Sequence, residues 1–146
     1  MNTKVVYHSS TGNTRKLAVA IAEAMFCEAE ELGKGDVLLN PAVDLMFIGD
    51  GTYYGHPDAN TVLFICSLDP STVKNVALFA TCGDKSSIGE SLKGLVVQQG
   101  LSLVGEPFVC KGEAWGRINK RRPNKTDIEN AQEYARTIRR LCGPES

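Results

Sequence analysis

Residues 9–14, SSTGNT, place four hydroxyl side chains, a glycine and an asparagine directly after a short apolar run. Hydroxyl groups donate hydrogen bonds, and at the start of a helix the backbone N–H groups and the positive end of the helix dipole point into the preceding turn. A glycine in such a turn permits a left-handed conformation and the close approach of a ligand. We interpret the segment as a cup for a phosphate group. The residues of this phosphate cup are Ser9, Ser10, Thr11, Gly12, Asn13 and Thr14.

The phosphate cup argues against two common classes of nucleotide-binding protein. It contains no lysine and lacks the GxxxxGK[ST] spacing of nucleotide triphosphatases. It also lacks the GxGxxG spacing of dinucleotide-binding folds. The alternative that these residues alone leave open is an ordinary helix start capped by serine or threonine.

Two further segments carry residue types that suit a ligand site. Segment 49–57 offers aromatic faces for a flat ring, and segment 81–87 offers backbone and side-chain donors. The candidates in these two segments are Thr52, Tyr53, Tyr54, Gly55, Thr81, Cys82, Gly83 and Asp84. A surface turn whose tyrosines pack on the domain is the alternative for the first segment. Cys82 is a poor candidate nucleophile, because both histidines lie in other segments and a reactive thiolate needs an activating base.

Segment 111–125 holds Trp115 and a basic cluster. The cluster consists of Arg117, Lys120, Arg121, Arg122 and Lys125. One interpretation of the cluster is a solvated surface, and the other is attraction of an acidic partner or a phosphorylated nicotinamide. Trp115 either shields a ligand, anchors a partner or packs over the last helix.

The elements that must position these segments alternate between short apolar runs and amphipathic stretches. We expect strands at 4–7, 45–48, 76–80 and 101–110, with a weaker strand at 27–32. We expect helices at 14–25, 59–68, 87–99 and 127–141, the last of them capped by Thr126.

This alternation predicts an α/β fold, a three-layer α/β/α sandwich around a five-stranded parallel sheet. Ligands of such sheets bind beyond the carboxyl ends of the strands. Each of the four segments follows a predicted strand, so we expect all four at that edge. No linker or repeat divides the 146 residues, and we expect a single domain spanning 1–146.

The phosphate cup fits the [ST]-x-T-G-x-T loop of flavodoxins, and the chain resembles a short-chain, bacterial flavodoxin-like protein over essentially its whole length. The segments GTYYG at 51–55, FATCGD at 79–84 and the ending FVCKGEAWGRINKRRPNKTDIENAQEYA at 108–135 fall where that family has them. The resemblance implies the strand order 2-1-3-4-5 and noncovalently bound FMN as the cofactor.

The resemblance also implies roles for the candidate residues. In the family the cup binds the FMN phosphate, an aromatic side chain after the third strand covers the flavin ring, and backbone groups after the fourth strand meet its pyrimidine edge. The resemblance also implies that Gly55 allows the neighbouring peptide group to reorient when the flavin is reduced, because glycine adopts positive and negative φ at little steric cost. His56 either is solvated or couples protonation to reduction, because an imidazole titrates near pH ~6.5.

Two features depart from the flavodoxin pattern. Segment 81–87 contains no aromatic residue, so the second face of the ring is covered by Trp115 or by nothing. The basic cluster differs from the strongly acidic surface that is typical of electron-carrying flavodoxins, which leaves the redox partner open.

The composition argues against several other classes of protein. The 16 basic and 17 acidic residues give a net charge of -1, which predicts no affinity for nucleic acid. No segment approaches the roughly 18 apolar residues of a membrane span. Five scattered cysteines without a CxxC pair favour a reducing compartment over a disulfide framework or a metal site. We expect a cytoplasmic monomer without membrane contact or bound metal.

The leading hypothesis is an FMN-binding electron carrier that shuttles one or two electrons between redox partner proteins, without a catalytic side chain of its own. The first alternative is an FMN-dependent oxidoreductase that acts on a quinone-like or porphyrinogen substrate. The second is a receiver-like signalling domain. Asp50 follows the third predicted strand, as such a domain requires, but the acidic cluster expected after the first strand is replaced by His8 and serines.

Overall fold

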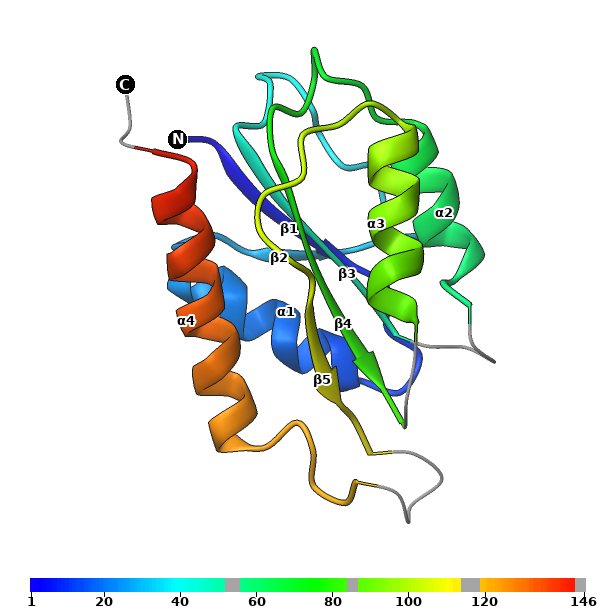
Figure 1. Ribbon diagram of the computed structural model, residues 1–146, viewed down its shortest axis with the longest axis vertical. Helices are drawn as coiled ribbons and strands as arrows, with labels where there is room; N and C mark the ends of the chain where they lie inside the picture. The colour runs from blue at the N-terminus through cyan, green and yellow to red at the C-terminus, as the bar shows by residue number, and fades with distance from the viewer. Residues whose placement is uncertain (52–55, 84–86, 114–118, 144–146) are drawn as a thin grey trace.

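The computed structural model describes residues 1–51, 56–83, 87–113 and 119–143 (Figure 1). Strands and helices alternate along the chain. They are β1 (Thr3–Tyr7), α1 (Asn13–Ala24), β2 (Ala29–Glu31), β3 (Leu45–Gly51), α2 (Ala59–Cys66), β4 (Val76–Cys82), α3 (Ile88–Gln98), β5 (Phe108–Lys111) and α4 (Lys125–Leu141). All strand pairs are parallel and the sheet order is β2-β1-β3-β4-β5, which confirms the predicted class and order.

The helices cover the two faces of the sheet, with α1 and α4 on one face and α2 and α3 on the other (Figure 1). Every residue of the neighbouring strands β3 and β4 is buried, because both faces of these strands pack against helices. Side chains alternate between the faces: Phe47 and Phe79 pack towards α1 and α4, whereas Ile48 and Leu78 pack towards α2 and α3. None of the described helices is long and apolar enough to cross a membrane.

One glycine in β3 is required by packing. A Cβ atom on Gly49 would lie 2.1 Å from Cε2 of Phe79, which is the register partner of Gly49 on β4. The absence of a side chain therefore lets the Phe79 ring occupy the space over Gly49 and pack in the core between the sheet and α1.

Two predicted boundaries are wrong. The expected strand at 101–110 is much shorter: β5 begins at Phe108, and Leu103 forms only an isolated bridge with Val76. Gly105 with φ 67 and Pro107, which has no N–H group, interrupt the extended run. The cap of α4 is not Thr126 but Asn124, two positions earlier.

Candidate functional site

The phosphate cup forms the turn between β1 and α1. Gly12 has φ 92 and stands at the N-cap of α1, and its N–H group donates to Ser9 Oγ at 3.1 Å. The N-cap residue itself has no side chain, so Gly12 accepts no capping hydrogen bond through a side chain. Because the first turn of a helix has no intrahelical acceptors for its N–H groups, these donors and the positive end of the dipole are available to an anion.

Thr14 links the cup to the segment after β4. Its hydroxyl lies 2.8 Å from the hydroxyl of Thr81, and the two residues are 1% and 4% exposed. The pair fixes the spacing between the first turn of α1 and the end of β4. The structure thus brings two sequence-predicted candidates into direct contact across the sheet edge.

Asn13 links the cup to the segment after β5. Its Nδ2 donates to the carbonyl of Glu113 at 2.8 Å, and a Cβ atom on Gly112 would lie 2.6 Å from the same nitrogen. Asn119 donates from Nδ2 to the carbonyl of Gly83 and, at 3.2 Å, to that of Gly112. Sequence reasoning missed these contacts of Gly112, Glu113 and Asn119, because a short polar side chain gives no signal of a backbone partner far away in the sequence.

The described ends of the segment after β3 meet a buried carboxylate. Asp50 is 0% exposed and accepts hydrogen bonds from the N–H groups of Gly51 and Asp58, at 2.7 and 2.8 Å. His8 lies 3.5 Å from each of the two carboxylates, through Nδ1 to Asp50 and Nε2 to Asp58. Burial raises the pKa of Asp50, although its hydrogen bonds and His8 oppose that rise. His56 is exposed.

Some of the predicted contacts fall where no structural statement is made. Thr52, Tyr53, Tyr54, Gly55, Asp84, Trp115 and Arg117 lie outside the described residues. The described parts of the three segments, together with the cup, lie at the carboxyl ends of β1, β3, β4 and β5, as predicted.

The basic cluster contains an arginine with a structural partner. Arg122 forms a paired contact with Asp127, with Nη2 to Oδ1 at 2.6 Å and Nε to Oδ2 at 3.0 Å. Asp127 also accepts from the N–H group of Asn124, whose side chain accepts from the N–H group of Asp127 at 3.0 Å. This capping box begins α4 in place of the predicted Thr126 cap. The pKa of Asp127 is lowered chiefly by the hydrogen bonds from Arg122, and further by the N–H group of Asn124.

The cysteines near the site have the environment of packing residues. Cys82 and Cys110 are 8% and 5% exposed, and burial raises the pKa of Cys110 to about 11. A thiol with such a pKa carries little of the nucleophilic thiolate at neutral pH.

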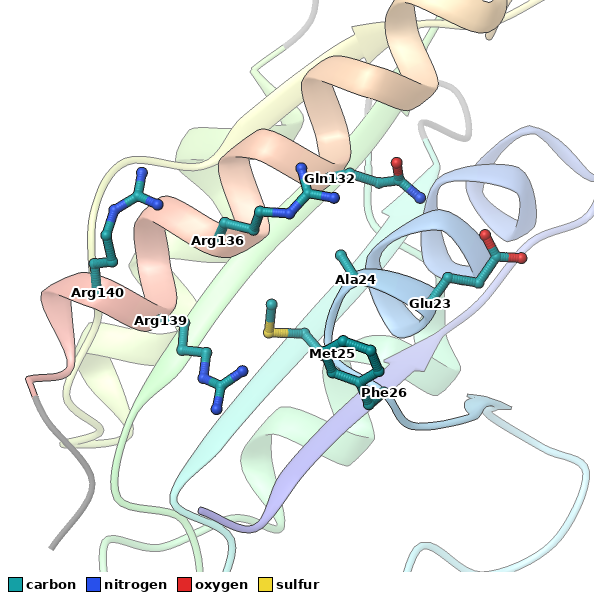
Figure 2. Close-up of a pocket in the computed structure, with 8 residues that line it drawn as sticks. All are labelled: Glu23, Ala24, Met25, Phe26, Gln132, Arg136, Arg139 and Arg140. Atoms are coloured by element: carbon teal, nitrogen blue, oxygen red, sulfur yellow. The ribbon is translucent and has the colours of Figure 1, made fainter.

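A hollow of about 440 Å³ lies at the other end of α1 (Figure 2). Its lining residues are Glu23, Ala24, Met25, Phe26, Gln132, Arg136, Arg139 and Arg140. Figure 2 shows Gln132 and Arg136 reaching from α4 towards α1, and Gln132 donates to the carbonyl of Ala20 at 3.2 Å. None of the predicted ligand contacts that lie within the described ranges lines this hollow, and the phosphate cup is at the opposite end of α1.

The sequence profile of the flavodoxin domain matches residues 4–121, which include the cup and all of the five strands except Thr3. The chain belongs to the flavodoxin domain family. A relative from Methanocaldococcus jannaschii, an uncharacterised protein, is 29% identical over 145 residues, 92% of this chain and 93% of its own length.

Solved flavodoxins share the fold. Oxidised flavodoxin 2 of Bacillus cereus has a TM-score of 0.74 at 17% identity, covering 96% of this chain and 99% of its own. A short-chain flavodoxin associated with a bacterial microcompartment also has a TM-score of 0.74, at 18% identity and with coverage of 98% and 100%. A Fusobacterium nucleatum flavodoxin mutant, solved with bound FMN, has a TM-score of 0.66 at 16% identity, with 95% of each chain covered.

Proposed function

We propose that this flavodoxin-family protein binds FMN noncovalently and carries one or two electrons between redox proteins. The observation that carries the proposal is the phosphate cup: a helix start without a side-chain cap, surrounded by hydroxyl groups, in a chain of this family. The likeness to a flavodoxin solved with FMN supports the choice of flavin.

The chemistry of the cup fits a phosphate monoester. Residues 9–14 contain no carboxylate, so nothing in the cup repels a dianion. Space is open where a Cβ atom of Gly12 would lie, so a ligand can approach the backbone there. Donors from the first turn of α1, with the hydroxyl groups of Ser10 and Thr11, are the groups proposed to bind the phosphate.

The remaining candidates are proposed to surround the flavin ring. Thr52, Tyr53, Tyr54 and Gly55 are assigned to the ring face, and backbone groups of Thr81, Cys82, Gly83 and Asp84 to its pyrimidine edge. FMN, when bound, supplies the one- and two-electron chemistry. The chain itself supplies orientation: the Thr14–Thr81 and Asn13–Glu113 contacts hold the phosphate-binding turn against the segments proposed to meet the ring.

Titration of the purified protein with FMN and with riboflavin tests the proposal. Each flavin is followed by quenching of its fluorescence. We expect FMN to bind more tightly than riboflavin, and Gly12→Ala to weaken FMN about tenfold with little effect on riboflavin, because a Cβ atom at φ 92 displaces the N–H groups of the cup.

Gly143→Ala is the matched control. Gly143 also has a positive φ, 84, and open space around its Cβ position, but it lies after the far end of α4. The Gly143→Ala variant should therefore bind FMN and riboflavin with unchanged affinities. An absence of quenching with both flavins would contradict FMN binding, and equal losses for both flavins in Gly12→Ala would show that the cup does not bind the phosphate.

The redox partner is proposed to be an acidic protein that meets the exposed basic residues beside the site. Lys120, Arg121 and Lys125 are the candidates among the described residues, because Arg122 is held by Asp127. A salt-dependent rate of electron transfer to an acidic acceptor protein would support this. Rapid oxidation of NAD(P)H by the flavin-loaded protein with a quinone acceptor would instead identify an enzyme.

A further inference from the structure

The hollow at the far end of α1 has the size of a ligand site and walls that pack against each other (Figure 2). Its volume of about 440 Å³ falls within the range of small-ligand sites, which is about 300–1,000 Å³. Gln132 of α4 joins the two walls by donating from Nε2 to the carbonyl of Ala20 in α1 at 3.2 Å. Met25, which is only 7% exposed, gives the lining a packed apolar part. The hollow is therefore already formed by the packing of α1 against α4.

The lining of the hollow carries an excess of positive charge. Arg136, Arg139 and Arg140 come from α4, and Glu23 is the single carboxylate among the lining residues that the structure describes. Glu133 lies 3.6 Å from Arg136 and 3.2 Å from Arg140, but all three side chains are about half exposed or more, so these pairs are weak. A guanidinium group has five N–H donors, of which one carboxylate uses two at most. Arginines three and four positions apart on a helix also repel each other, and a bound anion would relieve that repulsion.

The arginines are directed at the hollow rather than only at the end of their own helix. Figure 2 shows Arg136 and Arg139 reaching from α4 towards the end of α1, whereas Arg140 points away from it. The helix dipole accounts for basic residues in the last turn of α4, which are Arg139 and Arg140, but Arg136 lies one turn earlier. The carbonyl groups at the end of α1 accept hydrogen bonds from the N–H groups of residues 25–27. An anion in the hollow therefore meets guanidinium groups rather than unpaired carbonyls.

Phe26 adds an aromatic ring that the chain hardly covers. The residue adopts φ 57, which is strained for a residue with a Cβ atom, and it is 89% exposed, so burial of the ring does not offset the strain. Glycine would form the same turn without strain. Strained residues are concentrated at ligand-binding sites. The exposed ring therefore indicates a ligand that has a flat or apolar face of its own.

We propose that the hollow is a second ligand site, which binds a nucleoside diphosphate. The guanidinium groups of Arg136 and Arg139 bind the phosphate oxygens, because the planar fork of arginine matches a phosphate group. The base stacks on the ring of Phe26. The 12 residues of α1 make that helix about 18 Å long, so this site is distinct from the phosphate cup at the other end. The inference does not rest on the proposed function.

Nuclear magnetic resonance of the purified full chain, titrated with ADP and with GDP without divalent cations, tests the site. We expect saturable shifts of the amide signals of Phe26, Gln132 and Arg136. Inorganic phosphate and adenosine should each bind at least about tenfold more weakly than ADP, because each makes only part of the contacts. The absence of saturation with both nucleotides up to about 10 mM would overturn the proposal.

The phosphate cup is a competing place for the phosphate groups of ADP, and one variant separates the two sites. Thr11→Asp puts a negative charge into the cup, where it repels a phosphate group. The variant should keep the wild-type shifts of Phe26, Gln132 and Arg136 and the ADP affinity that these shifts measure. A loss of these shifts in Thr11→Asp would show that ADP binds at the cup, and it would overturn the proposal.

Substitutions in the hollow test the assigned contacts. Arg136→Gln and Arg139→Gln should each weaken ADP about tenfold, because each removes charge-assisted hydrogen bonds to the phosphate groups. Phe26→Gly should weaken ADP and GDP about tenfold with little effect on inorganic phosphate, because it removes only the stacking contact. Phe26→Gly also relieves strain, so it tests the proposal even if an arginine variant is unstable. Unchanged affinity for both nucleotides in Phe26→Gly would overturn the proposed stacking.

Lys93→Gln is the matched control for the arginine variants. It removes one positive charge from α3, which covers the opposite face of the sheet, and it should keep the wild-type affinity for ADP. A loss as large as that of Arg139→Gln would show that ADP responds only to the overall charge of the protein, which would overturn the assigned site.

Polyglutamate distinguishes a nucleotide site from a docking surface for acidic proteins. It carries negative charge without a flat ring, so at equal ionic strength its binding should be unaffected by Phe26→Gly. Binding of polyglutamate at the hollow without binding of either nucleotide would overturn the proposal. Flavin titrations test the cup separately, so the proposed function and this inference can fail independently.

Discussion

The helices α1 and α4 start at the same edge of the sheet, but their first N–H groups meet different surroundings. At α4, Asn124 and Asp127 form a reciprocal capping box and Arg122 neutralises the carboxylate. At α1, the N-cap is Gly12, which has no side chain to accept a hydrogen bond. The difference shows that the first-turn donors of α4 have partners within the chain, whereas the N-cap residue of α1 offers its helix none, which suits the phosphate that we propose there.

The largest difference between the two helix starts should appear when a carboxylate is placed at each of them. Thr11→Asp puts a negative charge into the phosphate cup, and it should weaken FMN about 100-fold through repulsion of the phosphate, with a much smaller effect on riboflavin. Thr126→Asp puts the same charge into the exposed first turn of α4 and should change neither affinity. Fluorescence titration measures both. Similar losses of FMN affinity in the two variants would contradict the assignment of the cup.

A second test removes the ionised cap of α4. Asp127→Asn should lower the free energy of unfolding by about 1 kcal/mol at pH 7, because it weakens the contact with Arg122 and the capping box; Arg122 is 36% exposed, so solvent keeps the effect small. The ratio of FMN to riboflavin affinity should stay unchanged. Urea denaturation measures the stability.

The pH dependence of that loss has a definite sign. The folded-state pKa of Asp127 lies below the ordinary value, so its contribution is complete above the unfolded-state pKa of about 3.9 and disappears as pH falls through the folded-state pKa. The stabilities of the wild type and of Asp127→Asn should therefore converge in acid, as the pH falls through the lowered folded-state pKa of Asp127. Glu129→Gln, on the exposed side of α4, is the control. If the difference in the free energy of unfolding between the wild type and Asp127→Asn persists in acid, the ionised carboxylate of Asp127 does not contribute to stability.

The smallest expected effect concerns the other end of α1. There the N–H groups of Phe26 and Cys27 donate to the carbonyls of Glu23 and Ala22, at 3.2 and 3.0 Å, in a Schellman motif. Phe26 takes the left-handed position with φ 57 and is 89% exposed, although glycine is the usual residue there. Phe26→Gly should stabilise the fold by about 0.5 kcal/mol in urea denaturation, because relief of the backbone strain exceeds the added entropy of the unfolded chain. A loss of stability would mean that the Phe26 ring contributes packing.

The sequence predicts most of the fold because the signals are local. Apolar runs define β3 and β4, and the spacing of Leu17 and Ile21 defines the buried face of α1. The errors arise where one residue overrides a favourable run. Gly105 and Pro107 shorten β5, and Asn124 precedes Thr126 as a cap because its side chain reaches the N–H group of Asp127.

The candidate site was predictable only in part. The cup shows in the sequence because its residues are contiguous. The cluster of His8, Asp50 and Asp58 does not, because a histidine and an aspartate distant in sequence give no sign of meeting until the order of β1 and β3 is known. Asn119 was missed for the same reason, since its partners are backbone carbonyls of other segments.

The contact between Asn13 and Glu113 has a consequence for the synthesis of the protein. The cup leaves the ribosome well before its support does, because the Asn13 side chain finds its partner a hundred residues later in the chain. Gly112, which gives that side chain room, is made equally late. A nascent chain that ends after β4 would carry the entire cup sequence without this support, so the proposed capture of FMN should follow, rather than guide, the folding of the segments after β4.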